Sequence, residues 1–197
     1  MISSVYMQSG QTTAENLQID PDNLLLWRRP ARRLEAEVIR DALLSVSGKL
    51  KKRMFGKGSL SQEDNRRSIY LTVKRSRLIP ILQLFDAPDS IQSIGHRNVT
   101  TVPPQALAMM NSPFARQLAE KFAKRVRPKA DVPLDKVVSD AYWIALSRDP
   151  SETEQSRTVA FVEAQTTSHG GNGPAVDRAV ADFCQMMLSL NEFLFID

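Results

Sequence analysis

The sequence predicts a mainly α-helical protein, a compact bundle of about six helices with one or two short β-strands near residues 67–74. Apolar residues recur at helical spacing along most of the second half of the chain. Serine and threonine stand just before prolines, which is typical of helix N-termini. Only one short stretch is rich in β-branched and aromatic residues. We expect residues 1–30 to form an extended N-terminal segment and residues 31–197 a single helical domain, with a basic loop at residues 49–66 as an insertion.

Size and composition fit a folded globular protein. A chain of 197 residues can bury roughly 70% of its unfolded surface. Hydrophobic residues make up 42% and charged residues 24%, which excludes a disordered chain. The single cysteine, Cys184, excludes a disulfide framework within the chain. No apolar run reaches the roughly 18 residues of a membrane-spanning helix, and the N-terminal residues show no signal-peptide pattern.

The first half of the chain predicts one well-defined helix, over residues 34–46, that ends near Gly48. Residues 1–23 are polar without a period and predict coil. Residues 67–74 are the best strand candidate, and a short helix is expected over residues 78–85. The expected inward face of the 34–46 helix is Leu34, Val38, Ile39, Ala42, Leu43 and Val46, and its expected polar side is Arg32, Arg33, Glu35, Glu37, Arg40 and Asp41.

Residues 97–114 predict two helix starts in quick succession. Thr100 and Thr101 stand before a proline pair, and Ser112 stands directly before Pro113. Serine and threonine side chains accept hydrogen bonds from the first amide groups of a helix, and proline fits its first turn. The stretch therefore indicates structure rather than catalysis.

Further helices are expected in the second half, beginning at Pro133 and at Ser151, where Glu154 completes a capping box. A glycine-rich loop over residues 168–174 precedes the last helix. The residues expected to be buried on the last four helices are Ala115, Leu118, Ala119, Phe122 and Val126; Leu134, Val137, Val138, Ala141, Tyr142 and Ala145; Val159 and Val162; and Val176, Ala179, Val180, Phe183, Met187 and Leu190.

No recognisable catalytic or metal-binding motif is present, so the sequence leans against an enzyme. His96 and His169 have no neighbours at ligand spacing and are expected to be loop residues. The chain lacks a Cys-x-x-Cys-His motif for covalent haem attachment, and we expect no metal and no cofactor in it. Cys184 is expected to be a buried, unreactive residue, because no cationic side chain stands close to it in the sequence.

Acidic residues are the remaining candidates for chemistry. Asp86 and Asp89 suit a hard cation or acid–base catalysis, but Asx turns explain them better. If the chain were an enzyme, we would expect these two aspartates to lie in one pocket with Glu37 and His96. A second acidic group lies among arginines of the 34–46 helix and is best explained as surface ion pairs. It consists of Glu35, Glu37 and Asp41.

The strongest functional candidate is a basic segment. Between Lys49 and Arg77, ten lysines and arginines face only Glu63 and Asp64, a local charge of +8 that leaves −4 for the remaining chain. Such a segment suits a phosphate or sulfate polymer or a partner protein. Few aromatic residues are interspersed, which disfavours base stacking. The candidate anion- or partner-binding residues are Lys51, Lys52, Arg53, Lys57, Arg66, Arg67, Lys74 and Arg75.

Several blocks, in their order along the chain, resemble one family. They are Ser3–Ser9, Asn23–Arg28, Arg32–Ala42, Arg66–Tyr70 with Val73–Ser76, Phe85–Asp89, Asn98–Leu107, Asp182–Cys184 and Asn191–Asp197. Together they are similar to the C-terminal part of a planctomycete domain-of-unknown-function family, a surface domain family found beside or fused to cytochrome-c-like modules. The positions that carry the resemblance include Trp27, Arg33, Glu37, Arg40, Asp41, Asp86, Asp89, Arg97, Thr100, Thr101 and Gln105.

The resemblance implies a chain that belongs to a longer, exported protein, and it defines no catalytic residues. We therefore expect a non-catalytic structural or interaction module of a larger exported or cell-surface system, with a protein partner such as a cytochrome-c-like module. Two alternatives stay open. One is an enzyme or accessory domain linked to polysaccharide breakdown or cytochrome-c electron transfer. The other is polyanion binding through residues 49–77.

Overall fold

The computed structural model describes residues 3–4, 7–88 and 94–196, and most of its regular structure is helical, as the sequence predicts. The chain divides into two compact units. Unit 1 comprises residues 1–34 and 195–197, and unit 2 comprises residues 35–194. No helix within the described ranges is long and apolar enough to cross a lipid bilayer.

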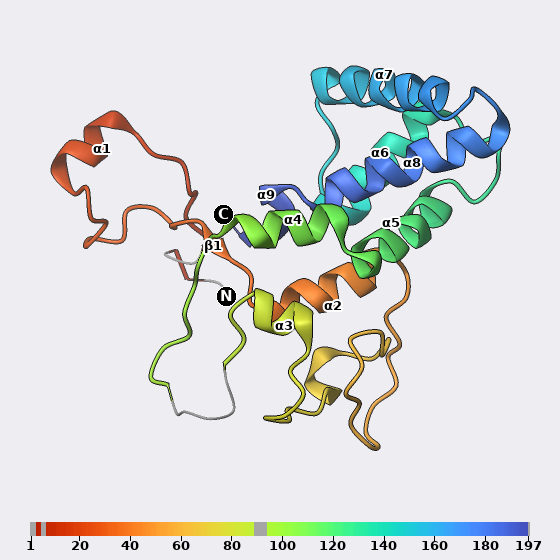
Figure 1. Ribbon diagram of the computed structural model, residues 1–197. Helices are drawn as coiled ribbons and strands as arrows, with labels where there is room; N and C mark the ends of the chain where they lie inside the picture. The colour runs from red at the N-terminus through yellow and green to blue at the C-terminus, as the bar shows by residue number, and fades with distance from the viewer. Residues whose placement is uncertain (1–2, 5–6, 89–93, 197) are drawn as a thin grey trace. The chain divides into compact units, whose positions relative to one another are not determined.

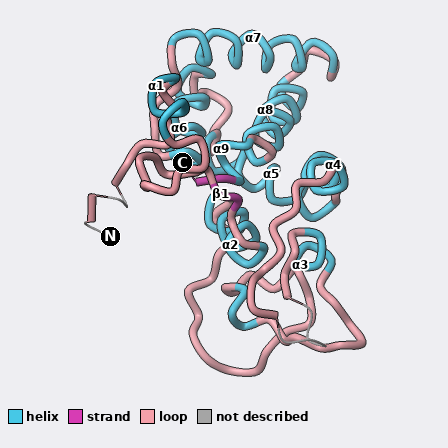
Figure 2. The backbone as a smooth tube through the Cα atoms, turned by 90° about the vertical axis from the view of Figure 1, so that its left-hand side faces the viewer, coloured by secondary structure: helices cyan, strands magenta, loops and turns pink. Residues whose placement is uncertain are grey.

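Unit 1 contains a two-stranded antiparallel sheet and a short helix. The strands are β1 (Arg32–Arg33) and β2 (Phe195–Ile196), with Arg33 opposite Phe195 (Figure 2). The sheet thus pairs residues 32–33 with the last described residues, 195–196. This location differs from the predicted strand region at residues 67–74.

The helix of unit 1, α1 (Ala14–Ile19), corrects the prediction of coil over residues 1–23. Thr13 caps it by accepting a hydrogen bond from the amide of Asn16 at 3.3 Å, and Glu15 lies in its first turn. A cap and an acidic first turn stabilise even a single helical turn, although six residues are too few to show a hydrophobic period.

Unit 2 contains the remaining helices, which bring the α-helices of the described residues to nine. They are α2 (Ala36–Val46), α3 (Pro80–Leu84), α4 (Pro103–Asn111), α5 (Pro113–Val126), α6 (Leu134–Leu146), α7 (Glu152–Ser168), α8 (Gly173–Leu188) and α9 (Asn191–Leu194). Helix α8 packs against α5 and α7, and α6 also packs against α7 (Figure 1). The predicted helical core is therefore confirmed, with additional short helices.

The core of unit 2 lies between α5, α6, α7 and α8. Phe122 on α5 and Phe183 on α8 are fully buried, as their helical spacing predicts. Ala119 and Ala179 are also fully buried, and such small residues let helix backbones approach closely. Cys184 is buried as expected, and burial raises the pKa of its thiol.

The buried face of α2 differs from the prediction at five positions: Ala36, Arg40 and Leu44 are buried although this was not expected, and Val38 and Ala42 are not buried. Ile39 and Leu43 are fully buried as expected, but Val38 is exposed. Arg40, expected on the polar side, is fully buried in its place. Residues 36, 40 and 43 are spaced by four and three, so Arg40 does lie on the inward side of the helix. Its charge, not its spacing, made the prediction wrong.

The segment expected to form a strand instead contains a short 3₁₀-helix, η1 (Ser68–Tyr70), and isolated bridges. The bridges join Lys51 to Arg66 and Ser59 to Leu71. Side chains from α2 bind the polar groups of residues 66 and 68, so these groups are not available to a continuous strand ladder.

Of the two helix starts predicted within residues 97–114, one has the expected cap. Ser112 accepts a hydrogen bond from the amide of Ala115 at 3.1 Å, at the start of α5. At α4 the N-cap is Val102, so the expectation of a threonine cap is wrong. The side chain of Gln105 accepts a hydrogen bond from the Val102 amide at 3.4 Å, which satisfies that group without a threonine.

An ion-pair network joins the start of α7 to α9. Arg148 donates to both carboxylate oxygens of Glu154, at 2.9 and 2.8 Å, and it also pairs with Glu192. The amide of Ser151 donates to Glu154 at 2.8 Å, which completes the predicted capping box. These contacts, chiefly that with Arg148, lower the pKa of Glu154 from 4.5 to about 2.

This pKa predicts a pH dependence of stability. Because the carboxylate is favoured in the folded state, its contribution is complete above pH 4.5 and is lost as the pH falls toward 2. The side chain is 35% exposed, so solvent reduces the effect to about 1 kcal/mol. In urea unfolding, Glu154→Gln should be about 1 kcal/mol less stable than the wild type at pH 6 and nearly equal to it at pH 2. An equal difference at both pH values would contradict the assignment, and Glu152→Gln is the matched control.

Candidate functional site

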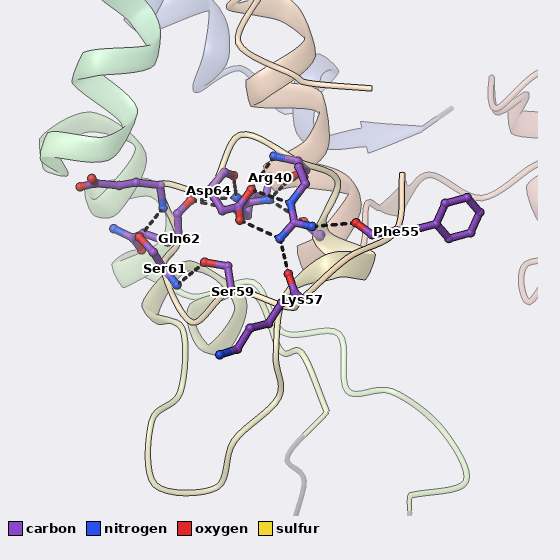
Figure 3. Close-up of polar contacts among 10 residues, drawn as sticks. Arg40, Phe55, Lys57, Ser59, Ser61, Gln62 and Asp64 are labelled. Carbon is purple, nitrogen blue, oxygen red and sulfur yellow. Dashed lines mark hydrogen bonds and ion pairs between the residues drawn. The ribbon is translucent and has the colours of Figure 1, made fainter. Parts of the chain in front are cut away.

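The site that brings most of the predicted residues together is the basic lobe, residues 49–77, which is held by the buried side chain of Arg40. Arg40 donates from Nε and Nη2 to the carbonyl oxygen of Gln62, at 3.1 and 2.9 Å. Its Nη1 donates to the carbonyl of Arg66 and to Oγ of Ser68, both at 3.1 Å. Its Nη2 also donates to the carbonyl of Asp64, which lies beside Arg40 in Figure 3. One side chain of α2 thus binds four residues of the lobe.

Asp41, the neighbour of Arg40, completes this attachment. Its Oδ1 accepts hydrogen bonds from the amide and the hydroxyl of Ser68, both at 2.7 Å. Its Oδ1 also lies 3.6 Å from Nη1 of Arg40. Burial lowers the pKa of Arg40, while the carboxylates of Asp41 and Asp64 act in the opposite direction. Nearby negative charge and carbonyl acceptors therefore compensate a guanidinium that is taken out of water.

Arg66 is used inside the basic lobe. Its guanidinium pairs with Asp64 at 3.1 Å and donates to the carbonyls of Phe55 and Lys57, at 3.2 and 2.8 Å. It also lies 5.2 Å from the ring centroid of Tyr70. The hydrogen bond from Arg66 lowers the pKa of Asp64. Arg66 thus connects residues within the lobe and is not available to a partner, since its side chain is largely buried.

The other seven predicted cations of the basic lobe remain exposed. They are Lys51, Lys52, Arg53, Lys57, Arg67, Lys74 and Arg75. Among them lies Phe55, whose side chain is 74% exposed and points away from the polar cluster (Figure 3). Its φ of 62° is in the left-handed region, which is uncommon for a bulky residue. Arg66 holds the carbonyl of this residue, so the lobe displays an aromatic ring in a strained but fixed conformation.

Backbone hydrogen bonds connect the two halves of the basic lobe, residues 51–59 and residues 65–72. The amide of Lys51 donates to the carbonyl of Asn65 at 2.7 Å, and the amide of Thr72 donates to the carbonyl of Ser59 at 2.7 Å. The amide of Ser59 donates to the carbonyl of Tyr70 at 3.1 Å. The lobe is therefore ordered by long-range contacts rather than by regular secondary structure.

A substitution at Gly58 tests this packing, because Gly58 lies against Tyr70 and Thr72 of the opposite half of the lobe. A Cβ at this position would stand 2.3 Å from Oγ1 of Thr72 and 3.3 Å from the carbonyl oxygen of Tyr70. We expect Gly58→Ala to lower the free energy of unfolding by about 1–2 kcal/mol. Gly95→Ala is the control and should be nearly neutral, because an added Cβ there would meet no atom of the described residues beyond its chain neighbours within 4 Å. Equal midpoints of urea unfolding for the two variants would contradict the packing.

A second group of predicted residues joins α2, α3 and α4. Arg97 donates to both oxygens of Glu37, at 2.7 and 3.2 Å. Asp86, which has a φ of 61°, accepts from the amide of Thr100 at 2.7 Å and from its hydroxyl at 2.8 Å. The buried side chain of Gln105 donates to the carbonyl of Leu84 at 3.0 Å. These residues fix the chain between α3 and α4, with donors directed at both carboxylates.

A cavity of about 420 Å³ lies beside this second group. Glu37 and Arg97 line it, together with Ala87 and Pro88, the two residues that follow Asp86. Much of the remaining wall is aliphatic, including Val73, Leu78, Ile79 and Leu82. His96 is exposed and does not line it, and Asp89 lies outside the described residues. Thr101 is exposed.

His169, which the sequence predicts only as a loop residue, contacts an acidic side chain of α8. It follows α7, and its Nε2 lies 2.7 Å from Oδ2 of Asp182 on α8. The other oxygen of Asp182 accepts a hydrogen bond from Arg116 of α5 at 2.6 Å. The three side chains therefore link α5, α7 and α8. The partners stand 13 and 66 residues apart, so no local pattern could have identified them.

Trp27 and Arg33 belong to unit 1. Arg33 is buried on β1. Trp27 donates from its indole nitrogen to the carbonyl of Asp20 at 2.8 Å. The carboxylate of Asp20 accepts hydrogen bonds from the amides of Leu24 and Leu25, at 2.9 and 2.7 Å. This turn leaves the side chains of both leucines largely exposed.

Comparison with known proteins identifies the family. The family model of PSD1, described as a protein of unknown function (DUF1553), matches residues 1–162. The match includes the basic lobe and all the positions around Arg40, Glu37 and Asp86, and it ends within α7. The search of curated proteins and the search of solved structures both gave no match. The chain belongs to the PSD1 (DUF1553) family of proteins of unknown function.

Proposed function

We propose that this chain is a non-catalytic interaction module that binds a partner protein through the basic lobe. The observation that carries the proposal is that some polar residues fix the backbone of this lobe while most of its cations remain exposed. Arg40, Asp41 and Arg66 fix its backbone, whereas seven cations and the ring of Phe55 remain exposed. A preorganised surface loses less conformational entropy on binding than a flexible one.

The placement of the carboxylates supports a structural rather than a catalytic role. Glu37 is bound by both nitrogens of Arg97, and Asp86 by two donors of Thr100. A general base must reach the proton that it removes. Carboxylates already held by such donors are better suited to fixing loops, and His96 does not line the cavity that Glu37 lines. The enzyme and accessory-domain hypothesis therefore has less support.

The chemistry of the basic lobe favours an acidic protein surface that also offers apolar contacts. Exposed cations steer association with an acidic partner, and an exposed aromatic residue is typical of the anchor in a protein interface. Met54 is exposed beside Phe55 and extends the apolar contact. The family resemblance adds a context, a larger exported or cell-surface protein, in which a cytochrome-c-like module is the first partner to test.

The test measures binding of the full chain to cytochrome-c-like domains encoded in the same genome, by isothermal titration calorimetry. Phe55→Ala and Lys52→Glu should each raise the Kd about tenfold or more. Trp143→Ala and Arg157→Glu, at exposed positions of α6 and α7, are matched controls that should change it less than twofold. Failure of every domain to bind, or equal effects of lobe and control variants, would contradict the proposal.

Polyanion binding is the second candidate, and the local charge of +8 favours it. It predicts retention on heparin that falls steeply with salt, because binding releases counterions. Triple replacement of Lys51, Lys52 and Arg53 by glutamate should abolish retention, whereas Phe55→Ala should leave it unchanged. Retention that is independent of salt would exclude this candidate.

A further inference from the structure

A cavity of about 460 Å³ lies between α5 and α8, apart from the basic lobe. Its charged lining residues are Arg116, Lys124, Arg127, Lys129 and Arg178, against Glu120 and Asp177. Five cations and two anions give this wall a net formal charge of +3. Its apolar lining includes Ala123, Val180 and Ala181. Neither the sequence motifs nor the family match assigns a role to it.

Arg127 is the fixed cation of this cavity. Its side chain is only 9% exposed, although the carboxylate of its partner Asp177 lies largely in solvent. Its Nη2 donates to the carbonyl of Ala130 at 2.7 Å, while the N–H of Nε is buried without an acceptor. A buried guanidinium with one exposed carboxylate is incompletely compensated, which leaves positive potential at the wall.

Three further cations add to this potential. Lys124, Lys129 and Arg178 have no ion pair with any part of the chain that the structure describes, and they are exposed at the rim. Arg116 is held by Asp182 at 2.6 Å and by Glu120 at 3.2 Å. The cavity thus combines two positioned arginines with three exposed cationic side chains that can contact a bound ligand.

We propose that this cavity binds a small organic anion, a molecule with one phosphate or carboxylate group and an apolar body. The anionic group is placed against Arg127, Lys129 and Arg178, because charge-assisted hydrogen bonds to oxyanions are the strongest that these side chains make. The apolar body is placed on Pro128 and Ala130, which are the exposed apolar residues of the lining, because Ala123, Val180 and Ala181 are almost fully buried. The volume falls within the range of about 300–1,000 Å³ that is usual for small-molecule sites.

The proposal is tested by titrating the full chain with inorganic phosphate, phenyl phosphate and benzoate at constant ionic strength. Isothermal titration calorimetry measures the Kd of each anion. Phenyl phosphate should bind more tightly than inorganic phosphate, because it adds the apolar contact. Benzoate binding as tightly as phenyl phosphate would identify a carboxylate head group, and weaker binding a phosphate. Failure of phenyl phosphate and benzoate to bind would overturn the proposal.

Variants locate the site and separate it from the basic lobe. Arg178 and Lys129 are exposed, so replacing either by glutamine should leave folding unchanged. Arg178→Gln and Lys129→Gln should each weaken anion binding about tenfold. Lys121→Gln, on α5 but outside the cavity wall, and Lys52→Gln, in the basic lobe, should leave it unchanged. Loss of binding in the Lys52 variant alone would assign the anion to the lobe and overturn the proposal, whatever the outcome of the partner-binding test.

Discussion

Arg40→Met is expected to lower the free energy of unfolding by about 3–5 kcal/mol. Methionine keeps much of the length of the side chain but donates no hydrogen bond. The carbonyls of Gln62, Asp64 and Arg66 would lose their donor, and Asp41 would lose a neighbouring positive charge. Urea unfolding measures the loss, and limited proteolysis should cut first within the basic lobe, because this is the part that Arg40 attaches.

The matched control for this experiment is Arg67→Met. Arg67 also faces Asp41, at 3.6 Å, but its side chain is 67% exposed. An exposed ion pair contributes little, so we expect a change below about 0.5 kcal/mol. If the two variants unfolded at the same urea concentration, Arg40 would not be the residue that holds the lobe.

Phe183→Ala is expected to have a similarly large effect, about 3–5 kcal/mol, for a different reason. Phe183 is fully buried on α8, which packs against α5 and α7. Removing the ring loses its transfer free energy and leaves a cavity that rigid helices only partly close. Thermal and urea unfolding should both report the loss, with cooperativity preserved.

Trp143→Ala removes a larger aromatic side chain from α6 and serves as the control. The residue is 61% exposed, so little buried contact is lost. We expect a change of about 1 kcal/mol or less. A loss at Trp143 equal to that at Phe183 would show that the core does not lie between the helices as described.

The helices of unit 2 could be predicted from the sequence because their signals are local. Ser112 and the pair Ser151 and Glu154 lie next to the helices that they cap, and the apolar residues of α8 repeat at helical spacing. The strand near residues 67–74 was predicted in the wrong place for the converse reason. The conformation of this segment depends on Arg40 and Asp41, which bind Arg66 and Ser68 across 26 to 28 residues of sequence.

The basic lobe shows what local reasoning missed. The excess of cations was visible in the sequence, but not that Arg66 would be used internally while Phe55 would be displayed. Arg40 was placed on the polar side because charged residues are rarely fully buried. Its position among the inward residues of α2 was the available signal. The link between His169 and Asp182 and the α5–α8 cavity arise from tertiary packing alone.

Hydrogen exchange of the basic lobe tests the central claim most directly, that buried contacts from α2 hold this lobe in one conformation. The amides of Lys51, Ser59 and Thr72 lie outside helices and strands, yet each donates a backbone hydrogen bond. We predict that they exchange at least about a hundredfold more slowly than in an unstructured chain. Exchange of these amides at the unprotected rate would contradict the account.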